Sequence, residues 1–240
     1  MALEKIRARK EKPENSSKFN AQKEAGYIFI YDFDDTLYPS SYMEQDNIKD
    51  RDRLVSLDDK IHKLLSLSKA HGPVYVITNA SESHVMSCIE KNLPKVFLML
   101  DSINIISARD IFCCSRFVYK GDCIKWKSQA IRIIISKVLS ERNTLSPVHL
   151  ISVGDSDIDR LATIDASGYQ SNNLVCKIIK LKRRPTLMTL YKQISALIFY
   201  MDVILANERG FDLKMCIEPS LVKSPGLSIV NGVSELIATP

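Results

Sequence analysis

Two carboxylates at the end of an apolar run are the residues in this chain whose types and spacing best suit catalysis or cation binding. The apolar segment 27–31 leads into Asp32, and Asp34 follows two residues later. Alternation along an extended chain would point both carboxylates to the same side. Two like charges at the end of a buried strand are unfavourable unless a cation or a reaction uses them. We therefore place Asp32 and Asp34 at the centre of a candidate active site.

Three later segments carry polar side chains that suit the same kind of site. They are Thr78-Asn79 at the end of an apolar run, Lys127 at the start of a helical pattern, and Asp155 with Asp159 after a further run. A hydroxyl and a fixed cation can hold the oxygens of a phosphoryl group during its transfer. Carboxylate oxygens are the ligands that a hard divalent cation prefers. Together these segments add a hydroxyl, a cation and two further acids that follow Asp32 and Asp34 in the chain.

The segment Asp-Phe-Asp-Asp-Thr-Leu resembles the first motif of the haloacid-dehalogenase-like superfamily, Asp-x-Asp-x-Thr-Leu after an apolar strand. The longer form Asp-Asp-Thr-Leu-Tyr-Pro-Ser-Ser is similar to uncharacterised protist and algal members. In the phosphatases of this superfamily the first Asp becomes an aspartyl phosphate and the second is a general acid/base. The resemblance implies that Asp32 is the nucleophile, that Asp34 is the acid/base and that Thr36 supports the turn. It covers about residues 27–201.

The other motifs of the superfamily imply roles for the later segments. Thr78 resembles the second motif, whose hydroxyl receives a phosphoryl oxygen. Lys127, in a Trp-Lys pair before a helix, resembles the third motif, whose cation neutralises the nucleophile and the phosphoryl oxygens. Lys125 and Lys120 stay open as alternatives, because spacing does not exclude them.

The fourth motif implies a magnesium site. Gly154-Asp155 followed by a second acid four residues later, Asp159, resembles it. Asp32, the backbone carbonyl of Asp34, and Asp155 would coordinate Mg²⁺, and Asp159 would help directly or through water. The cofactor expected from the sequence is therefore Mg²⁺.

Five strand-like segments alternate with helical patterns along the chain. They are 27–31, 73–78, 102–107, 147–153 and 174–181. This order predicts an α/β fold, a Rossmann-like parallel sheet flanked by helices, with the site at the carboxyl ends of the strands. The gaps after the first and third strands are too short for a full cap domain, so we expect a haloacid-dehalogenase-like core with a minimal cap or none. Such an open site suits a macromolecular substrate, or one closed over by a partner or by the tail.

We divide the chain into a basic N-terminal arm at 1–24, a catalytic domain at 25–201 and a C-terminal extension of unknown role at 202–240. Within the domain, Ser56 with Asp59 resembles a capping box that opens a helix after a charged connector. A group of basic residues decorates the fifth strand and its exit: Lys177, Lys180, Lys182, Arg183 and Arg184. Because no aromatic residues interleave with them, we expect a solvated strand end rather than a nucleic-acid site.

Composition limits the remaining classes. The net charge is +5 over 240 residues, which permits acidic or phosphorylated partners without requiring nucleic acid. The six cysteines show no metal-type spacing and fit a reducing cytosol. The charged start lacks the apolar core of a signal peptide, and the apolar run 194–206 is too short to cross a bilayer. We expect a cytoplasmic protein without a membrane segment.

The sequence thus predicts a Mg²⁺-dependent phosphomonoester hydrolase that acts on a phosphorylated substrate, with Thr36, Asn79 and Arg109 as candidates for substrate binding. The alternative is a phosphatase fold that serves as a binding or scaffold component, with a protein partner at the N-terminal arm or the C-terminal extension. Deleting 1–24 and 202–240 should spare turnover but abolish assembly if those segments serve partners.

Overall fold

The structure, a computed structural model, is built on one sheet. It describes residues 26–44, 51–113, 118–142, 146–168, 173–217, 227–230 and 233–238. The strands are β1 (Tyr27–Tyr31), β2 (Val74–Thr78), β3 (Asn104–Ser107), β4 (Val148–Gly154), β5 (Leu174–Lys180), β6 (Phe211–Ile217), β7 (Leu227–Val230) and β8 (Val233–Ala238). Their order is β3-β2-β1-β4-β5-β6-β8-β7, and every neighbouring pair is parallel except β7 with β8. The predicted Rossmann-like α/β fold is confirmed.

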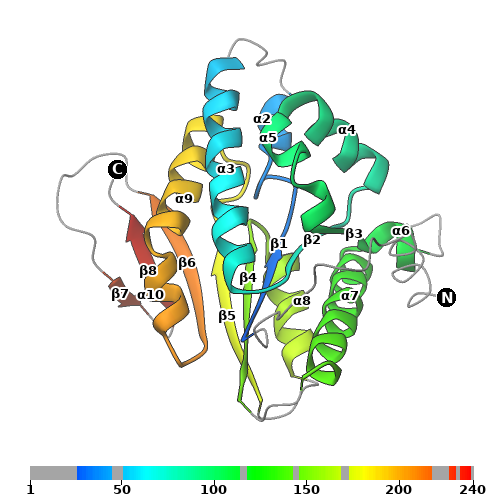
Figure 1. Cartoon of the computed structure of the whole chain (residues 1–240), viewed down its shortest axis with the longest axis vertical. Helices are drawn as coiled ribbons and strands as arrows, with labels where there is room; N and C mark the ends of the chain where they lie inside the picture. The colour runs from blue at the N-terminus through cyan, green and yellow to red at the C-terminus, as the bar shows by residue number, and fades with distance from the viewer. Residues whose placement is uncertain are drawn as a thin grey trace, which may run out of the picture.

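Helices cover both faces of this sheet (Figure 1). They are α2 (Ser40–Met43), α3 (Arg51–His71), α4 (Glu82–Asn92), α5 (Pro94–Phe97), the short 3-10 helix η2 (Leu100–Ser102), α6 (Ala108–Phe112), α7 (Lys120–Ser140), α8 (Asp157–Ser167), α9 (Leu187–Phe199) and α10 (Met201–Ala206). Helix α3 packs on α9 over one face, and α7 packs on α8 over the other. Among the helices that the structure describes, none is long and apolar enough to span a membrane.

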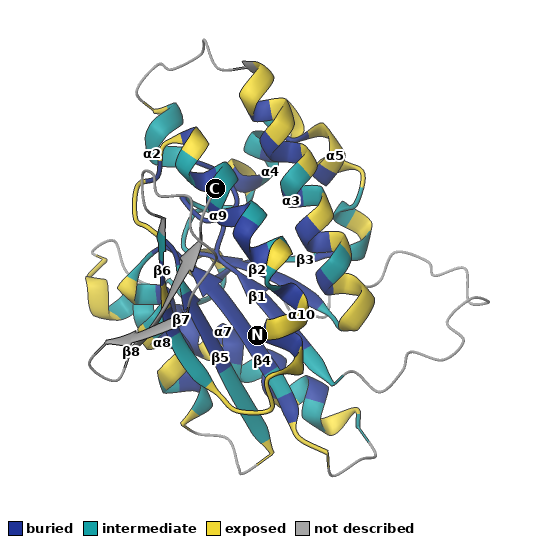
Figure 2. Ribbon diagram, turned by 90° about the vertical axis from the view of Figure 1, so that its left-hand side faces the viewer, coloured by how far each residue is buried: buried dark blue, intermediate teal, exposed yellow. Residues whose placement is uncertain are grey.

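The central strands are buried on both sides, which explains their nearly continuous apolar sequences. Along β1, Phe29 and Tyr31 join the core under α3 and α9, whereas Ile28 and Ile30 join the core under α7. Figure 2 shows the central strands buried while the helices expose their outer faces. The alternation within β1 fixes which face each side chain enters.

The strand order reverses direction between β1 and β4. From β1 the chain proceeds outward to β2 and β3, then crosses to β4 and continues to β5 and β6 on the other side. Open α/β sheets bind ligands in the crevice at such a point, beyond the carboxyl ends of the strands. The fold therefore directs attention to the residues that follow β1 and β4.

The start of α3 differs from the sequence prediction. We expected Ser56 to open this helix, but the helix begins at Arg51, and Ser56 Oγ donates to the carbonyl of Asp52 at 3.1 Å within it. The first turns carry exposed polar residues because they lie beyond the core, so the apolar periodicity starts only at Leu54. The acid Asp52 in the first turn suits a helix N-terminus.

Part of the predicted C-terminal extension belongs to the sheet. Strand β6 pairs with β5, and β8 pairs with β6. The alternation of Phe211, Leu213 and Met215 was the signal for β6, and the last two side chains are 6% and 1% exposed. Deleting 202–240 would uncover β5, so that deletion would report on folding rather than on partner binding. The arm at 1–24 lies outside the described residues.

Lys177 is buried, which corrects the prediction of a solvated strand end at this position. Its side chain is 0% exposed, and its Nζ donates to the carbonyls of Ile204 at 2.6 Å and Leu205 at 3.2 Å. These carbonyls lie at the end of α10, where helical partners are missing. Tyr27 Oη also donates to the Leu205 carbonyl, at 3.1 Å. Burial lowers the pKa of Lys177 to about 8.

We expect Lys177 to make stability rise with pH. Its pKa is about 8 in the folded protein against an ordinary value of 10.5, so between these values the unfolded chain binds the proton more strongly. The free energy of unfolding, measured by urea titration, should therefore gain about 1–3 kcal/mol from this residue between about pH 8 and pH 10. Lys177→Met should lack this gain. Lys182→Met, at an exposed lysine of the same segment, should keep it; equal slopes in all three proteins would contradict the assignment.

Candidate active site

A tight turn follows β1 and presents the first acids of the site. The backbone N–H of Asp32 still pairs with the carbonyl of Val153 on β4, at 2.9 Å. The carbonyl of Phe33 then accepts the N–H groups of residues 36, 37 and 38, at 3.3, 2.9 and 3.0 Å. Asp35 adopts a left-handed backbone with φ 56°, and its carboxylate accepts the backbone N–H of Ser41 at 2.9 Å. Hydrogen bonds of the backbone and of the side chains therefore both stabilise this turn.

Three carboxylates converge where β1 and β4 end. Oxygens of Asp32, Asp155 and Asp159 all lie within 4.8 Å of one another, and each residue is at most 7% exposed. Buried like charges are unfavourable without a compensating cation. One lysine, Lys127, accompanies the three acids, so full ionisation leaves an excess of two negative charges. This donor set fits one hard divalent cation such as Mg²⁺.

Lys127 crosses from α7 to join two of these acids. Its side chain is buried, and its Nζ donates to Asp32 Oδ1 at 2.5 Å and to Asp159 Oδ1. The other candidates, Lys125 and Lys120, are exposed. The structure therefore brings Lys127, and neither of the alternatives, into the cluster. Helical spacing explains the difference, because α7 buries Trp126, Lys127 and the apolar residues that follow on one face.

Asp159 has a second task at the start of α8. Its Oδ2 accepts the backbone N–H of Ser156 at 3.1 Å, and its own N–H donates to Ser156 Oγ at 3.4 Å, which forms a capping box. The Ser156 hydroxyl also donates to Oδ2, at 2.6 Å. From the sequence we had expected Asp159 only as a residue of the magnesium site. Gly154 permits this approach, since a Cβ at that position would lie 2.4 Å from the Cβ of Asp159.

Asp34 lies apart from the three buried acids, with a side chain that is 35% exposed. Its Oδ1 accepts the Ser40 hydroxyl at 2.5 Å, and its Oδ2 accepts the Thr78 hydroxyl at 3.2 Å. His84 Nε2 lies 4.0 Å from Oδ1. The Thr78 hydroxyl in turn accepts the N–H of Ala80 at 2.9 Å. Thr78 therefore orients Asp34 directly, a contact that sequence reasoning did not foresee.

These groups open onto a polar cavity of about 250 Å³. The described residues that line it are Asp32, Asp34, Asp35, Ser41, Thr78, Asn79, Ala80, Lys127, Asp155, Ser156, Ile158, Arg183 and Arg184. Six of the residues selected from the sequence are among them, and they lie at or just after the ends of β1, β2 and β4 and on α7. Asn79 Nδ2 donates to the carbonyl of Cys123 at 3.4 Å, while its Oδ1 finds no partner among the described residues.

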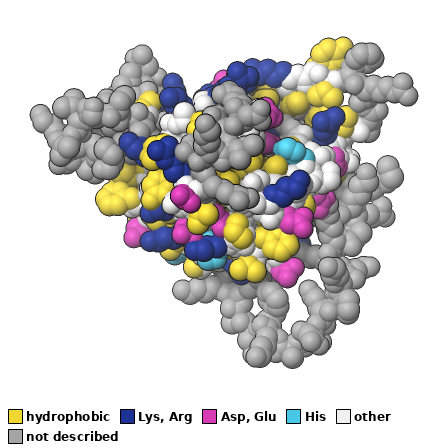
Figure 3. All heavy atoms as spheres, turned by 90° about the horizontal axis from the view of Figure 1, so that it is seen from above, with side chains coloured by type: hydrophobic (Ala, Val, Ile, Leu, Met, Phe, Trp, Pro, Cys, Tyr) yellow, Lys and Arg dark blue, Asp and Glu magenta, His cyan; other side chains and the backbone are white. Residues whose placement is uncertain are grey.

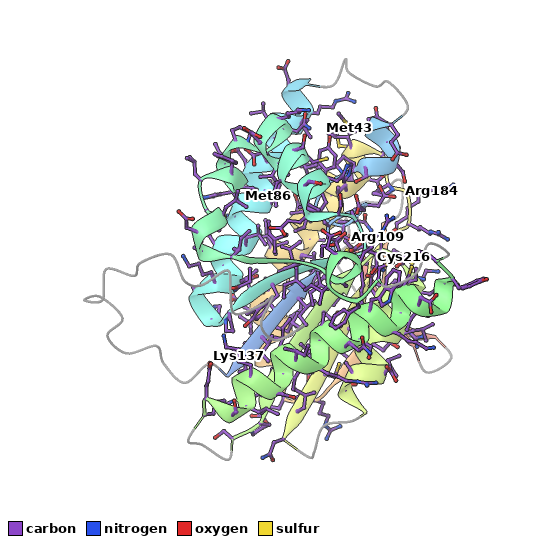
Figure 4. The ribbon with its side chains drawn as sticks, turned by 90° about the vertical axis from the view of Figure 1, so that its right-hand side faces the viewer. Met43, Met86, Arg109, Lys137, Arg184 and Cys216 are labelled. Carbon is purple, nitrogen blue, oxygen red and sulfur yellow. The ribbon has the colours of Figure 1, made fainter. Side chains whose placement is uncertain are left out.

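Two of the substrate-binding candidates lie elsewhere. Thr36 is 0% exposed, and its hydroxyl donates to Asp32 Oδ2 at 3.4 Å. It therefore holds the Asp32 carboxylate and is not among the described residues that line the cavity. Arg109 is exposed at the start of α6 and is not among the described residues that line the cavity. Figure 4 labels Arg109 right of centre, Arg184 at the right-hand side and Lys137 at the lower left of the view.

Sequence reasoning missed several residues that shape the site. Ser40 and Ser41 bind the carboxylates of Asp34 and Asp35, with Ser41 Oγ donating to Asp35 Oδ2 at 2.6 Å. Their place directly after the first motif was the available signal. Arg183 and Arg184 are exposed, as the sequence predicted for this strand end, but they also line the cavity, which the sequence did not predict.

Burial and mutual repulsion perturb the acids of this site. Burial, together with the charges of Asp159 and Asp35, raises the pKa of Asp155 to about 7. Burial and Asp159 raise the pKa of Asp32 above its ordinary value, against the opposing effect of Lys127. Burial alone would lower the pKa of Lys127, but Asp159 and Asp32 raise it. The positive charge of one lysine therefore does not balance the negative charges of these three carboxylates.

Comparisons of the chain with protein-family models, with curated proteins and with solved structures find no match. The resemblance to the haloacid-dehalogenase-like superfamily therefore stays a prediction from the motifs. The contacts described above are properties of the site itself and do not depend on that resemblance.

Gly154→Ala should displace Asp159, because the added Cβ would meet its side chain at 2.4 Å. We expect a loss of about 1–3 kcal/mol in the free energy of unfolding and weaker binding of Mg²⁺ by calorimetry. Gly168→Ala is the matched control, since its Cβ would meet nothing closer than 3.6 Å and its φ of −65° suits alanine. If both variants behave alike, the close approach at Gly154 is unimportant.

Mg²⁺ should stabilise the protein more at about pH 8 than at about pH 5. The raised pKa of Asp155, about 7, means that the folded state binds a proton there more strongly than the unfolded chain. Without a cation, stability is therefore lost as pH rises through 7, and a cation that replaces the proton should restore it. The melting temperature with and without MgCl₂ at the two pH values measures this.

Asp155→Asn should abolish most of that Mg²⁺ effect. Asp157→Asn is the matched control, because Asp157 is exposed and pairs with Lys180 instead of joining the cluster. An equal response of both variants to Mg²⁺ would remove Asp155 from the cation site.

Proposed function

We propose that this protein is a Mg²⁺-dependent phosphomonoester hydrolase that works through an aspartyl phosphate on Asp32. The observation that carries the proposal is the buried cluster in which Lys127 links Asp32 to Asp159 beside Asp155. This cluster opens onto a polar cavity that Asp34 also lines. A nucleophile, a fixed cation, a cation site and a separate acid are the parts that phosphoryl transfer requires.

Asp32 is placed to act as the nucleophile. Lys127 holds one of its oxygens and Thr36 approaches the other, so the carboxylate has a defined orientation at the cavity wall. Each carboxylate oxygen keeps a further lone pair for reaction. In the first step an Asp32 oxygen bonds to phosphorus while the bond from phosphorus to the ester oxygen breaks.

Asp34 is placed to move the proton. Its carboxylate is more exposed than the buried three, and the hydroxyls of Ser40 and Thr78 fix its direction. In its protonated form it would give that proton to the leaving ester oxygen. It would then take a proton from the water that attacks the aspartyl phosphate, which releases phosphate and restores Asp32.

The phosphoryl oxygens need positive charge beside them. Lys127 has three N–H donors, and two are directed at Asp32 and Asp159. The third is available for a phosphoryl oxygen. Asp32, Asp155 and Asp159 would hold Mg²⁺, and the ion when bound would screen the repulsion between carboxylate and phosphate.

Hydrolysis of para-nitrophenyl phosphate tests the proposal. The purified protein should turn over with Mg²⁺ and stop with a chelator, and Asp32→Asn should be inactive. Asp34→Asn should lower kcat by about 10²–10⁴-fold, because it removes the proton transfer. Asp157→Asn should stay near wild type, since its exposed carboxylate pairs with Lys180.

A second readout identifies the intermediate. Rapid acid quenching followed by peptide mass spectrometry should find phosphate on the peptide that contains Asp32, and borohydride reduction should convert that residue to homoserine. Turnover that survives in Asp32→Asn, or phosphate on another residue, would refute the proposal.

A further inference from the structure

Two arginines stand at the edge of the cavity with no side-chain partner among the residues that the structure describes. Arg183 and Arg184 line the cavity together with Asp32 and Asp155. Neither guanidinium makes a hydrogen bond or ion pair to any residue that the structure describes. Figure 3 shows lysine and arginine side chains in separate groups among acidic ones on the face seen from above. These two arginines are distinguished by their place beside the reacting groups.

The backbone fixes both arginines at that place. The N–H of Leu181, just after β5, donates to the carbonyl of Gly154 at 2.8 Å, which ties the segment to the end of β4. Arg184 has a left-handed backbone with φ 48°, an uncommon conformation for a residue with a Cβ. Pro185 follows and is buried. This turn therefore holds two adjacent cations, both exposed to solvent, at the edge of the cavity.

Their neighbours in the sequence are different. Lys180 is paired with Asp157. Lys182 is exposed, as the two arginines are, but it is not among the described residues that line the cavity. The arginines thus differ from the adjacent lysines in lining the cavity, which a uniformly basic surface would not explain.

We infer that Arg183 and Arg184 bind a second anionic group of the substrate, a phosphate or a carboxylate apart from the phosphoryl group that is transferred. This inference rests on the proposed hydrolase function and specifies its substrate class. Lys127 already faces Asp32, where the transferred group must bind, whereas the arginines occupy the cavity wall beyond β5. Guanidinium groups bind phosphate and carboxylate through paired N–H donors, which suits recognition of a fixed anion.

Matched substrates test the inference. One pair is 3-phosphoglycerate and glycerol 3-phosphate, which differ in a carboxylate; the other is adenosine 3′,5′-bisphosphate and AMP, which differ in a phosphate. The wild-type protein should favour the doubly anionic member of at least one pair in kcat/KM. In Arg183→Gln/Arg184→Gln that preference should fall about 10–100-fold. Lys182→Gln, which removes one charge from the same segment, should keep it.

Other outcomes overturn the inference. A wild-type protein without preference in either pair, or a double variant that keeps the preference, would leave the arginines no such role. A loss of equal size for both members of each pair and for para-nitrophenyl phosphate would assign the arginines to the transferred phosphoryl group instead.

A binding experiment separates this inference from the proposed hydrolysis. If the wild type hydrolyses nothing, including para-nitrophenyl phosphate, the function proposal fails. Calorimetry on Asp32→Asn, with and without the two arginine substitutions, then decides the matter with adenosine 3′,5′-bisphosphate and AMP. Tighter binding of the bisphosphate that depends on the arginines would uphold the anion site, and equal binding would refute it.

Discussion

The ammonium of Lys127, held between Asp32 and Asp159, is the interaction on which the rest of the site depends. It joins the end of β1 to the first turns of α7 and α8, which are far apart in sequence. A buried charge that loses its partner is strongly unfavourable, by about 3–5 kcal/mol. Because three carboxylates surround one lysine, the cluster is also short of positive charge. The same constraint that holds the elements together thus makes the site receptive to a cation.

The sheet topology supplies the place for that cluster. Asp32 follows β1 and Asp155 follows β4, and the strand order reverses between these two strands. Parallel strands deliver their carboxyl ends to one edge, so short segments from distant parts of the chain meet there. Helices on both faces exclude water from the strands and leave this edge open. The residues of the candidate site are therefore carried by turns on a rigid support.

The strands added beyond β5 extend this support. Strand β6 pairs along β5, and Lys177 ties β5 to the last carbonyls of α10. The exit of β5 leads directly to the turn that carries Arg183 and Arg184. A segment that looked like an appendage thus buttresses the strand from which the cavity's arginines emerge. The proposed anion site and the pairing of β5 with β6 therefore depend on the same strand.

The sequence by itself determined the alternating α/β order, the five strands from β1 to β5 and the acids that end β1 and β4, because apolar periodicity and motif spacing are local properties. Tertiary structure alone decided that Lys127 rather than Lys125 enters the cluster, that Thr36 lies behind Asp32, that Lys177 is buried, and that two arginines face the cavity. Each of these outcomes depends on which face an element turns toward its neighbours. Local patterns fix the type of an element, whereas the long-range packing of charged side chains is fixed only when the elements meet.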